Sequence, residues 1–207
     1  MNFTIDTISE ADYNKLKQHA LDVMPPVKYH NKYHARTVET VVTTLLAESQ
    51  HSFSNYNYTV LSLAALYHDT GHSTGNAENH EEKSCDIFLN EVSNLNSNIP
   101  DEFCDDICDC IMDTVFLEPC DTELGMYLAD ADVWSFGTDW KIFFKKTIDV
   151  RDEFAPDTSE ENWFRFRAYV LSIHEYQTDI GKQKYAIKKR QNKERICEDY
   201  GPPIQEI

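Results

Sequence analysis

Apolar side chains recur every three or four residues along most of this chain, and that spacing limits its fold more than any other feature. The segment 34–49 has apolar residues on one helical face, and the segment 57–69 repeats the pattern with more apolar character. Glycine is scarce, at six residues in 207, and no stretch is convincing as a strand. The sequence therefore predicts an all-α protein with the segment 57–69 in its core.

The predicted helices are joined by short loops. Ser9 with Asp12 three residues later is typical of a helix start, and Pro25 and Pro26 end that helix. No predicted loop is long enough to separate two domains, and 207 residues suffice for a proper core. We therefore expect a single-domain helical bundle over residues 1–207, closed by a basic C-terminal helix at about 180–199.

The charge of the chain is strongly negative and unevenly distributed. The net charge is −17, with 6 Lys or Arg against 24 Asp or Glu in residues 1–140 and 13 against 12 in residues 141–207. Such acidity makes no strong case for duplex nucleic acid and disfavours an anionic membrane. No apolar run could span a bilayer, and residues 1–13 lack the features of a signal peptide, so we expect a cytoplasmic protein. The oligomeric state is left open.

Two local features have simple interpretations. In a cytoplasmic chain of this size, the six cysteines are better read as free thiols than as disulfides or a zinc site. The basic residues of the tail are either a solvated helix face or a source of positive charge for an anionic substrate. These residues are Lys182, Lys184, Lys188, Lys189, Arg190, Lys193 and Arg195.

A few His and Asp residues lie near the ends of predicted apolar helices. His68 and Asp69 are adjacent, so on a helix their side chains diverge by about 100°, yet both can reach one ion at the end of a bundle. His34 and Asp130 lie near the ends of other helices. Imidazole and carboxylate together suit Mn²⁺, Fe²⁺, Co²⁺, Ni²⁺ or Zn²⁺, whereas Mg²⁺ is compatible but prefers oxygen.

The order of these motifs resembles that of the HD-domain phosphohydrolase superfamily. YHNxxH (29–34) is followed by HDxG (68–71), NHExxS (79–84), DAD (130–132), FxxxxxxxRxEF (143–154) and WFxxR (163–167), so the motif core covers about residues 29–170. The closest likeness is to small predicted metal-dependent HD phosphohydrolases. YHNxxH is also similar to the signature of cyclic-nucleotide phosphodiesterases.

The resemblance implies a divalent metal ion held by His34, His68, Asp69 and Asp130. Asp130 and Asp132 compete for the last place, because both belong to DAD and residues two apart on a helix face nearly opposite ways. The family pattern favours Asp130 and leaves Asp132 a supporting or capping role. Asp69 has two oxygens and could also bridge to a second ion.

The same resemblance implies roles for residues around the ion. His30 matches the position of a proton donor to the leaving oxygen, a task that suits histidine near neutral pH. His72 would orient water or a phosphate oxygen, and His80 would bind substrate phosphate or a second metal. Arg167 is the arginine of its segment that the family pattern directs to substrate. Each of these residues also has a purely structural interpretation.

The leading hypothesis is a metal-dependent phosphohydrolase that cleaves a phosphomonoester or phosphodiester, with nucleotides among the candidate substrates. Its partner would be a small anionic phosphorylated molecule. One alternative is a diiron oxygenase of the HD type, against which the lack of any histidine between His80 and His174 counts. The other is a non-catalytic HD module that binds a nucleotide or a metal.

Overall fold

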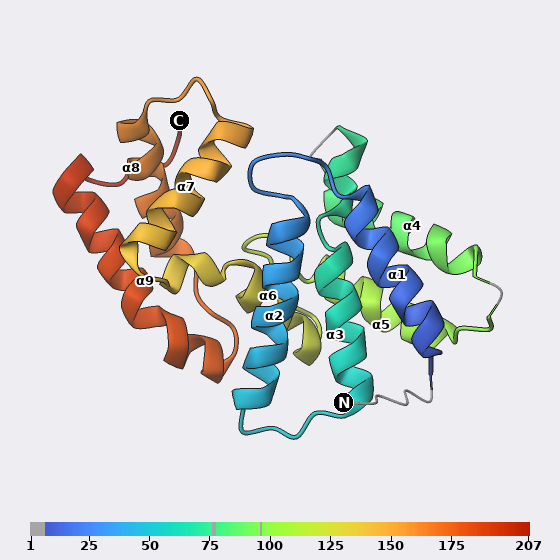
Figure 1. Cartoon of the computed structure of the whole chain (residues 1–207). Coiled ribbons are helices and arrows are strands. Elements are labelled where there is room, and N and C mark those ends of the chain that lie inside the picture. Colours follow the sequence, from blue (N-terminus) through green and yellow to red (C-terminus); the bar gives the residue numbers. More distant parts are fainter. Residues whose placement is uncertain (1–6, 76–77, 96) are drawn as a thin grey trace. The chain divides into compact units, whose positions relative to one another are not determined.

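The computed structural model describes residues 7–75, 78–95 and 97–207, and all regular elements in these ranges are helices (Figure 1). This confirms the all-α prediction. The chain divides into two compact units. The first runs to Pro26 and continues from His30 to Asp132, and the second contains Val27–Tyr29 and Val133–Ile207. That the two units form one domain remains a prediction.

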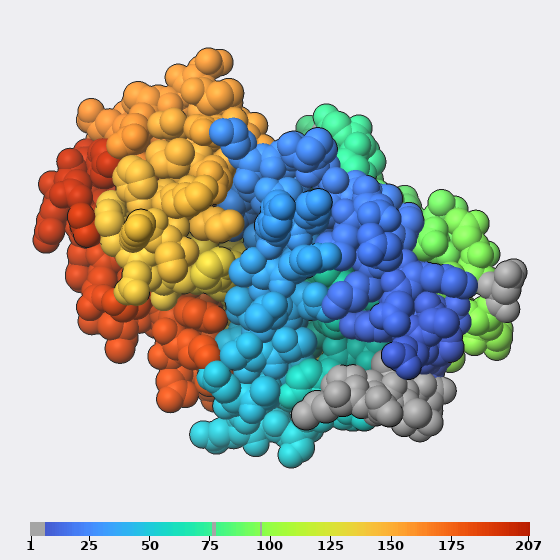
Figure 2. Space-filling model, in the orientation of Figure 1, coloured from blue at the N-terminus to red at the C-terminus, as the bar shows by residue number. Residues whose placement is uncertain are grey.

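The first unit is built around a central buried helix, α3. Positions 59–67 of this helix are all buried, because apolar residues occupy every side of it, and it packs beside α2, α5 and α6. Little of α3 is visible in Figure 2 between the side chains of α1 and α2. The elements of this unit are α1 (Glu10–Val23), α2 (Lys32–Glu48), α3 (Asn55–Tyr67), the 3₁₀ helix η1 (Thr70–Thr74), α4 (His80–Ser93), α5 (Asp101–Met112) and α6 (Glu123–Asp132).

Side-chain caps fix where the helices of this unit begin. The Ser9 hydroxyl accepts the backbone N–H of Asp12 at 3.1 Å, as the sequence pattern predicts. Ser54 forms a reciprocal cap with Asn57 at the start of α3. Pro25 follows closely after the end of α1, as expected. The two caps thus set the positions at which α1 and α3 begin, and Pro25 prevents α1 from continuing.

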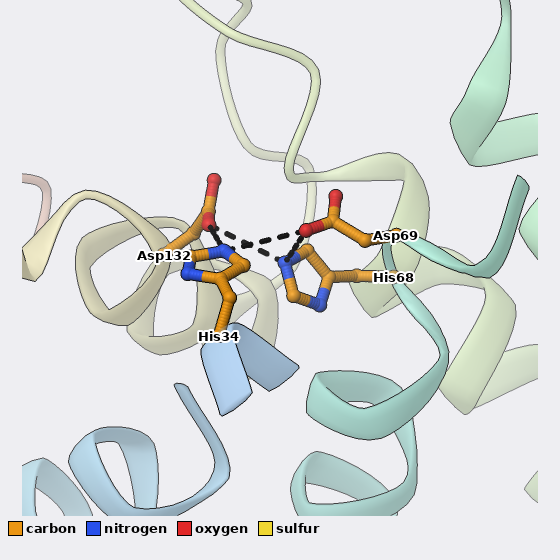
Figure 3. A group of neighbouring side chains, drawn as sticks. All are labelled: His34, His68, Asp69 and Asp132. Atoms are coloured by element: carbon orange, nitrogen blue, oxygen red, sulfur yellow. Dashed lines mark hydrogen bonds and ion pairs between the residues drawn. The ribbon is translucent and has the colours of Figure 1, made fainter. Parts of the chain in front are cut away.

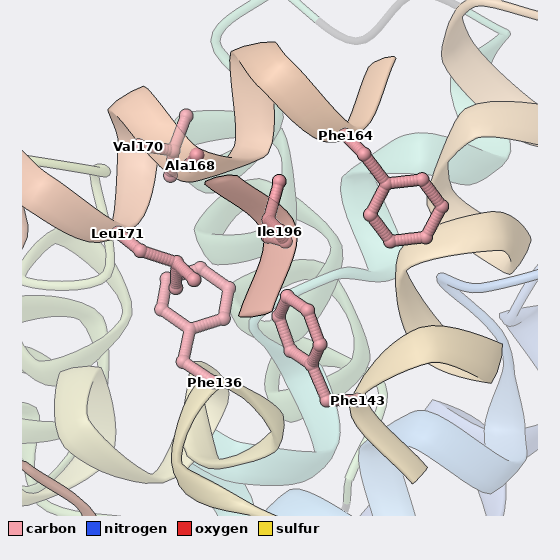
Figure 4. Packing of buried hydrophobic residues seen from close by; sticks show 7 residues of the cluster. All are labelled: Phe136, Phe143, Phe164, Ala168, Val170, Leu171 and Ile196. Carbon is pink, nitrogen blue, oxygen red and sulfur yellow. The ribbon is translucent and has the colours of Figure 1, made fainter. Parts of the chain in front are cut away.

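The second unit has its own apolar core (Figure 4). Its elements are the 3₁₀ helix η2 (Trp134–Gly137), α7 (Trp140–Phe154), α8 (Glu160–Ile173) and α9 (Asp179–Tyr200), the last of which confirms the predicted C-terminal helix. The Asn192 amide on α9 donates to the carbonyl groups of Phe136 at 3.0 Å and Thr138 at 2.9 Å, which ties η2 to α9. The core side chains are Phe136, Phe143, Phe164, Ala168, Val170, Leu171 and Ile196.

The structure also bears on the cysteines and on the prediction that no segment spans a membrane. All six cysteines are free, as expected. Among the described residues, no helix combines the length and the apolar character needed to cross a bilayer.

Candidate metal centre

His68 and Asp69 follow directly on the buried helix α3 (Figure 3). Nδ1 of His68 lies 2.8 Å from the carbonyl oxygen of Ala65. A carbonyl oxygen can only accept a hydrogen bond, so Nδ1 carries a hydrogen. In the neutral ring, Nε2 then has no hydrogen and presents a lone pair. This Nε2 faces two carboxylates, with Asp69 Oδ2 at 3.1 Å and Asp132 Oδ1 at 3.3 Å.

His34 reaches the same carboxylates from the first turn of α2. The Asn31 side chain accepts the backbone N–H groups of Tyr33 at 2.9 Å and His34 at 3.3 Å, so the asparagine of YHNxxH caps this helix. Nε2 of His34 lies 2.8 Å from Asp132 Oδ1 and 3.3 Å from Asp69 Oδ2. Residues from three sequence-distant motifs, on α2, directly after α3 and on α6, thus converge on one point.

The structure brings Asp132 to the two histidines. Both aspartates lie on α6, and Asp130 is also buried, at 1% exposure, but it does not belong to the cluster. Successive helical residues are rotated by about 100°, so two side chains two positions apart face nearly opposite directions. The group of possible ligands thus contains Asp132 where the family pattern favoured Asp130, and which of the two aspartates binds a metal remains a prediction.

The pKa values of His68, Asp69 and Asp132 depend strongly on the charges of the other residues in the cluster. Burial alone would lower the pKa of His68, but the carboxylates of Asp69 and Asp132 outweigh it and hold that pKa well above its ordinary value. Burial likewise would raise the pKa of Asp69 and Asp132, yet the neighbouring histidines hold both well below the usual range. The carboxylates therefore strongly favour a positive charge between them and the rings.

The donor set fits a divalent cation. One ligand atom each from His34, His68, Asp69 and Asp132 can be chosen such that all lie within 4.8 Å of one another. Oxygen Oδ2 of Asp69 is enclosed and makes no hydrogen bond of normal geometry among the described residues, although it faces both imidazole Nε2 atoms. Two imidazoles with two carboxylates suit a borderline first-row ion better than an all-oxygen one. These residues could hold a metal ion.

Three further histidines stack beside the cluster. The ring centroids of His30 and His72 are 4.4 Å apart, and those of His72 and His80 are 4.1 Å apart, with the planes nearly parallel in both pairs. Nε2 of His80 lies 3.6 Å from Asp69 Oδ1, and Nε2 of His72 lies 3.8 Å from it. The structure thus brings together His30, His72 and His80, which the sequence singled out as catalytic or substrate-binding.

This stack includes a second set of possible ligands. His30, Asp69 and His72 each offer an atom within 4.8 Å of the other two. Asp69 belongs to both sets, with Oδ2 facing His34 and His68 and Oδ1 facing the stack. That Asp69 bridges two ions remains a prediction.

A close contact between η1 and α4 holds the stack in place. A Cβ atom on Gly71 would lie 2.0 Å from the carbonyl oxygen of His80, so only glycine allows this approach. The Ser84 hydroxyl accepts the N–H of Gly71 at 2.8 Å and donates to the carbonyl of His68 at 2.7 Å. Glu81 Oε2 lies 3.2 Å from Nδ1 of His80 and orients that ring.

Sequence reasoning missed the positioning role of Ser84. A signal for it was present, because Gly71 and Ser84 are the final residues of HDxG and NHExxS. Arg167, the remaining predicted site residue, lies on α8 in the second unit.

Comparison with known proteins gives no independent assignment. No protein-family model matches the chain, and no curated protein matches it in sequence. The case for a function therefore depends on the residues and their geometry.

Proposed function

We propose that this chain is a metal-dependent phosphohydrolase of the HD type, acting on a phosphomonoester or phosphodiester, with nucleotides among the candidate substrates. One observation carries the proposal. Nδ1 of His68 is committed to a backbone carbonyl, so Nε2 of the neutral ring directs a lone pair at two carboxylates, the buried one of Asp69 and the partly exposed one of Asp132. The lone pair and the negative carboxylates repel one another, and a cation bound between Nε2 and the carboxylates removes this repulsion.

The contrasting interpretation is a structural ion pair with His68 protonated. A buried pair of this kind gives little net stability, because desolvation offsets the attraction, and apolar residues of similar size do as well or better. Two histidines and two carboxylates at one point, with a backbone acceptor that fixes one ring, match the arrangement by which proteins orient metal ligands. This favours the metal interpretation.

His34, His68, Asp69 and Asp132 would hold a divalent ion, which would lower the pKa of water and stabilise negative charge on the phosphoryl oxygens. His30 stacks on His72 beside Asp69, where an imidazolium could donate its proton to the leaving oxygen. His80, held by Glu81, could bind a phosphate oxygen. His72 lies between them and could orient water or another phosphate oxygen.

The direct test combines elemental analysis of purified protein with a screen for hydrolysis. The screen covers nucleotides and phosphorylated metabolites with Mn²⁺, Fe²⁺, Co²⁺, Ni²⁺, Zn²⁺ and Mg²⁺, and it scores phosphate release from monoesters and phosphomonoester release from diesters. We expect one or two ions per chain and metal-dependent hydrolysis. Replacement His30→Ala should reduce turnover at least about 100-fold while the metal content is retained, because a general acid typically contributes that much.

His51→Ala is the matched control, because the imidazole of His51 is exposed and remote from the cluster in the sequence. It should leave both metal content and turnover unchanged. Metal-loaded protein that hydrolyses no phosphomonoester and no phosphodiester in the screen would contradict the phosphohydrolase proposal. Loss of metal in His30→Ala would instead identify His30 as a ligand.

A second candidate function is an HD-type diiron oxygenase. The specific observation in its favour is the second ligand set of His30, Asp69 and His72, because Asp69 would then be shared by two ions. This candidate predicts two iron ions per chain and substrate-dependent oxygen uptake. The phosphohydrolase predicts phosphate release without oxygen uptake, so the two functions are separable in one set of assays.

A further inference from the structure

Large apolar side chains are exposed where α5 ends, in the first unit. The exposed fractions are 38% for Met112, 44% for Phe116 and 51% for Leu117. Backbone hydrogen bonds from Val115 to Met112 at 3.2 Å and from Glu118 to Val115 at 3.1 Å fold this segment into tight turns. Leu117 has a φ of 69°, a left-handed conformation that leucine disfavours because its Cβ atom approaches the following carbonyl oxygen. We call Met112, Phe116 and Leu117 the apolar tip of α5.

An acidic face on α5 leads up to this tip. Glu102, Asp105 and Asp109 are exposed and lie three or four residues apart, so they share one side of the helix. Met112 follows on the same side after three more residues. Among the described residues, none of the three carboxylates forms an ion pair. Burial, followed by the charges of Asp105 and Asp106, raises the pKa of Asp109, so these carboxylates repel one another.

The helices around α5 supply no compensating cation to this face. No Lys or Arg occurs in residues 84–140, which contain 14 Asp or Glu. The helix α5 packs against α3, α4 and α6, and Lys83 is the only Lys or Arg in those three helices. The ammonium of Lys83 donates to the carbonyl oxygen of Glu78 at 2.6 Å. The negative charge on α5 is therefore balanced from outside these helices.

The combination of charge and apolar surface points to a binding partner. Exposed acid alone would be explained by solubility, because a high net charge keeps molecules apart. Solubility does not explain the apolar tip, since exposed Phe, Leu and Met side chains favour association. Aromatic and Met side chains are enriched at interfaces, and partners there carry complementary charge. The face therefore fits a partner that is both cationic and apolar.

We propose that the acidic face and the apolar tip of α5 bind a Lys- or Arg-rich amphipathic helix of a partner protein. The positive side chains of that helix lie along Glu102, Asp105 and Asp109, and its apolar side chains cover Phe116 and Leu117. The 12 residues of α5 extend over roughly 18 Å, which matches about three turns of a partner helix. The inference does not depend on the proposed phosphohydrolase activity.

The test is isothermal titration of a synthetic Lys/Leu peptide of about 14 residues, designed as an amphipathic helix, into the full chain. We expect one peptide per chain and a micromolar dissociation constant. Phe116→Ser combined with Leu117→Ser should weaken binding at least about tenfold, because a few apolar anchors carry most of the binding energy of an interface. Asp105→Asn combined with Asp109→Asn should also weaken binding and should reduce its dependence on salt.

Matched controls come from the neighbouring helix α4. Leu89 is exposed, and Leu89→Ser should bind the peptide as the unmodified chain does. The same result is expected for Glu82→Gln combined with Asp86→Asn, which removes two exposed carboxylates from α4. His68→Ala should leave peptide binding intact, so failure of the metal centre and failure of this surface are distinguishable. Circular dichroism checks the folding of every variant.

A second peptide separates the apolar contribution from plain charge attraction. In this peptide serine replaces every leucine, so it keeps the charge and lacks the apolar face. It should bind at least about tenfold more weakly than the Lys/Leu peptide, because it cannot cover the apolar tip.

Three results would overturn the proposal. The first is no binding of the Lys/Leu peptide below about 100 µM. The second is equally tight binding of the serine peptide, or of the Lys/Leu peptide by Phe116→Ser combined with Leu117→Ser, because charge attraction alone would then explain the data. The third is self-association of the chain in analytical ultracentrifugation that the same double substitution abolishes, because a second copy would then cover the tip.

Discussion

Gly71 shows how a single residue determines the shape of the candidate centre. Its missing side chain lets η1 approach α4 so closely that a Cβ atom would lie 2.0 Å from the His80 carbonyl oxygen. Because His72 and His80 flank this contact, their stacking depends on it. A glycine in HDxG is therefore explained by packing, with no direct chemical role.

Replacement Gly71→Ala should test this packing. The methyl group meets backbone atoms, which cannot rotate away, so we expect the free energy of unfolding to fall by about 2–3 kcal/mol. Denaturant unfolding measures the change. Gly75→Ala is the control, because nothing lies within 4 Å of its Cβ position and only its left-handed backbone opposes the substitution, at about 1 kcal/mol. Equal costs at the two glycines would contradict the packing account.

His174 gives a pH prediction that does not involve the metal cluster. Its pKa falls from 6.5 to about 4 in the folded chain, chiefly because it is buried. Between these values the unfolded chain binds a proton that the folded chain does not, so this contribution to stability is complete above pH 6.5 and is lost as the pH falls towards 4. At pH 4.5 the loss should be about 2–3 kcal/mol relative to pH 7.

The measurement is the free energy of unfolding at pH 7 and at pH 4.5. His174→Gln cannot take up the proton, so the difference between the two pH values should shrink by about 2–3 kcal/mol. His51→Gln, at an exposed position, should leave the difference unchanged. If His174→Gln showed the same pH dependence as the unmodified chain, His174 would not be the source.

At the scale of helices, α6 delivers Asp132 to the cluster, and Asp113 holds the beginning of α6. The Asp113 carboxylate accepts the N–H groups of Asp121 at 2.8 Å and Thr122 at 3.0 Å, and the Thr122 hydroxyl at 2.6 Å. Thr122 Oγ1 in turn accepts the N–H of Gly125 at 2.9 Å. A buried carboxylate at the end of α5 thus sets the start of α6.

Asp113→Ala should therefore destabilise the chain by about 2–4 kcal/mol, because several buried donors lose a charged acceptor. The reduced stability can be read from chemical denaturation. Asp105→Ala is the matched control on α5, because Asp105 is exposed and should change stability by less than about 0.5 kcal/mol. A similar effect of both substitutions would show that Asp113 does not anchor α6.

The helices themselves could be predicted from the sequence, whereas the site could be predicted only in part. Apolar spacing identified α3 as the core helix, because a helix that is apolar on all sides must be buried. Asp132 could not be chosen over Asp130, because that choice depends on the rotation of α6 in its last turn. The stacking of His30, which precedes α2, on His72 of η1 joins sequence-distant segments, and no local pattern encodes such a contact.

At the scale of the whole molecule, the acidity is concentrated in the first unit. Nearly all of the excess of Asp and Glu lies before residue 140, while the later part is almost neutral. Like charges on one compact unit repel one another and destabilise it, and salt screens that repulsion. The asymmetry therefore has a measurable consequence for stability.

The melting temperature of metal-free protein should rise by a few degrees when NaCl is raised from about 20 to about 200 mM, because the screening length falls to roughly 7 Å. Scanning calorimetry or circular dichroism at several salt concentrations measures the rise. Hydrogen exchange should locate the gain in residues of the first unit. A melting temperature that falls with salt would mean that ion pairs outweigh the repulsion.

The central claim is that His34, His68, Asp69 and Asp132 hold one cation, and metal content tests it most directly. Elemental analysis should find bound metal in the unmodified chain and in Asp130→Asn, and loss of at least about 90% of it in Asp132→Asn and His68→Ala, since removing a ligand severely weakens a site. Full metal content in Asp132→Asn and His68→Ala, with correct folding, would contradict the account.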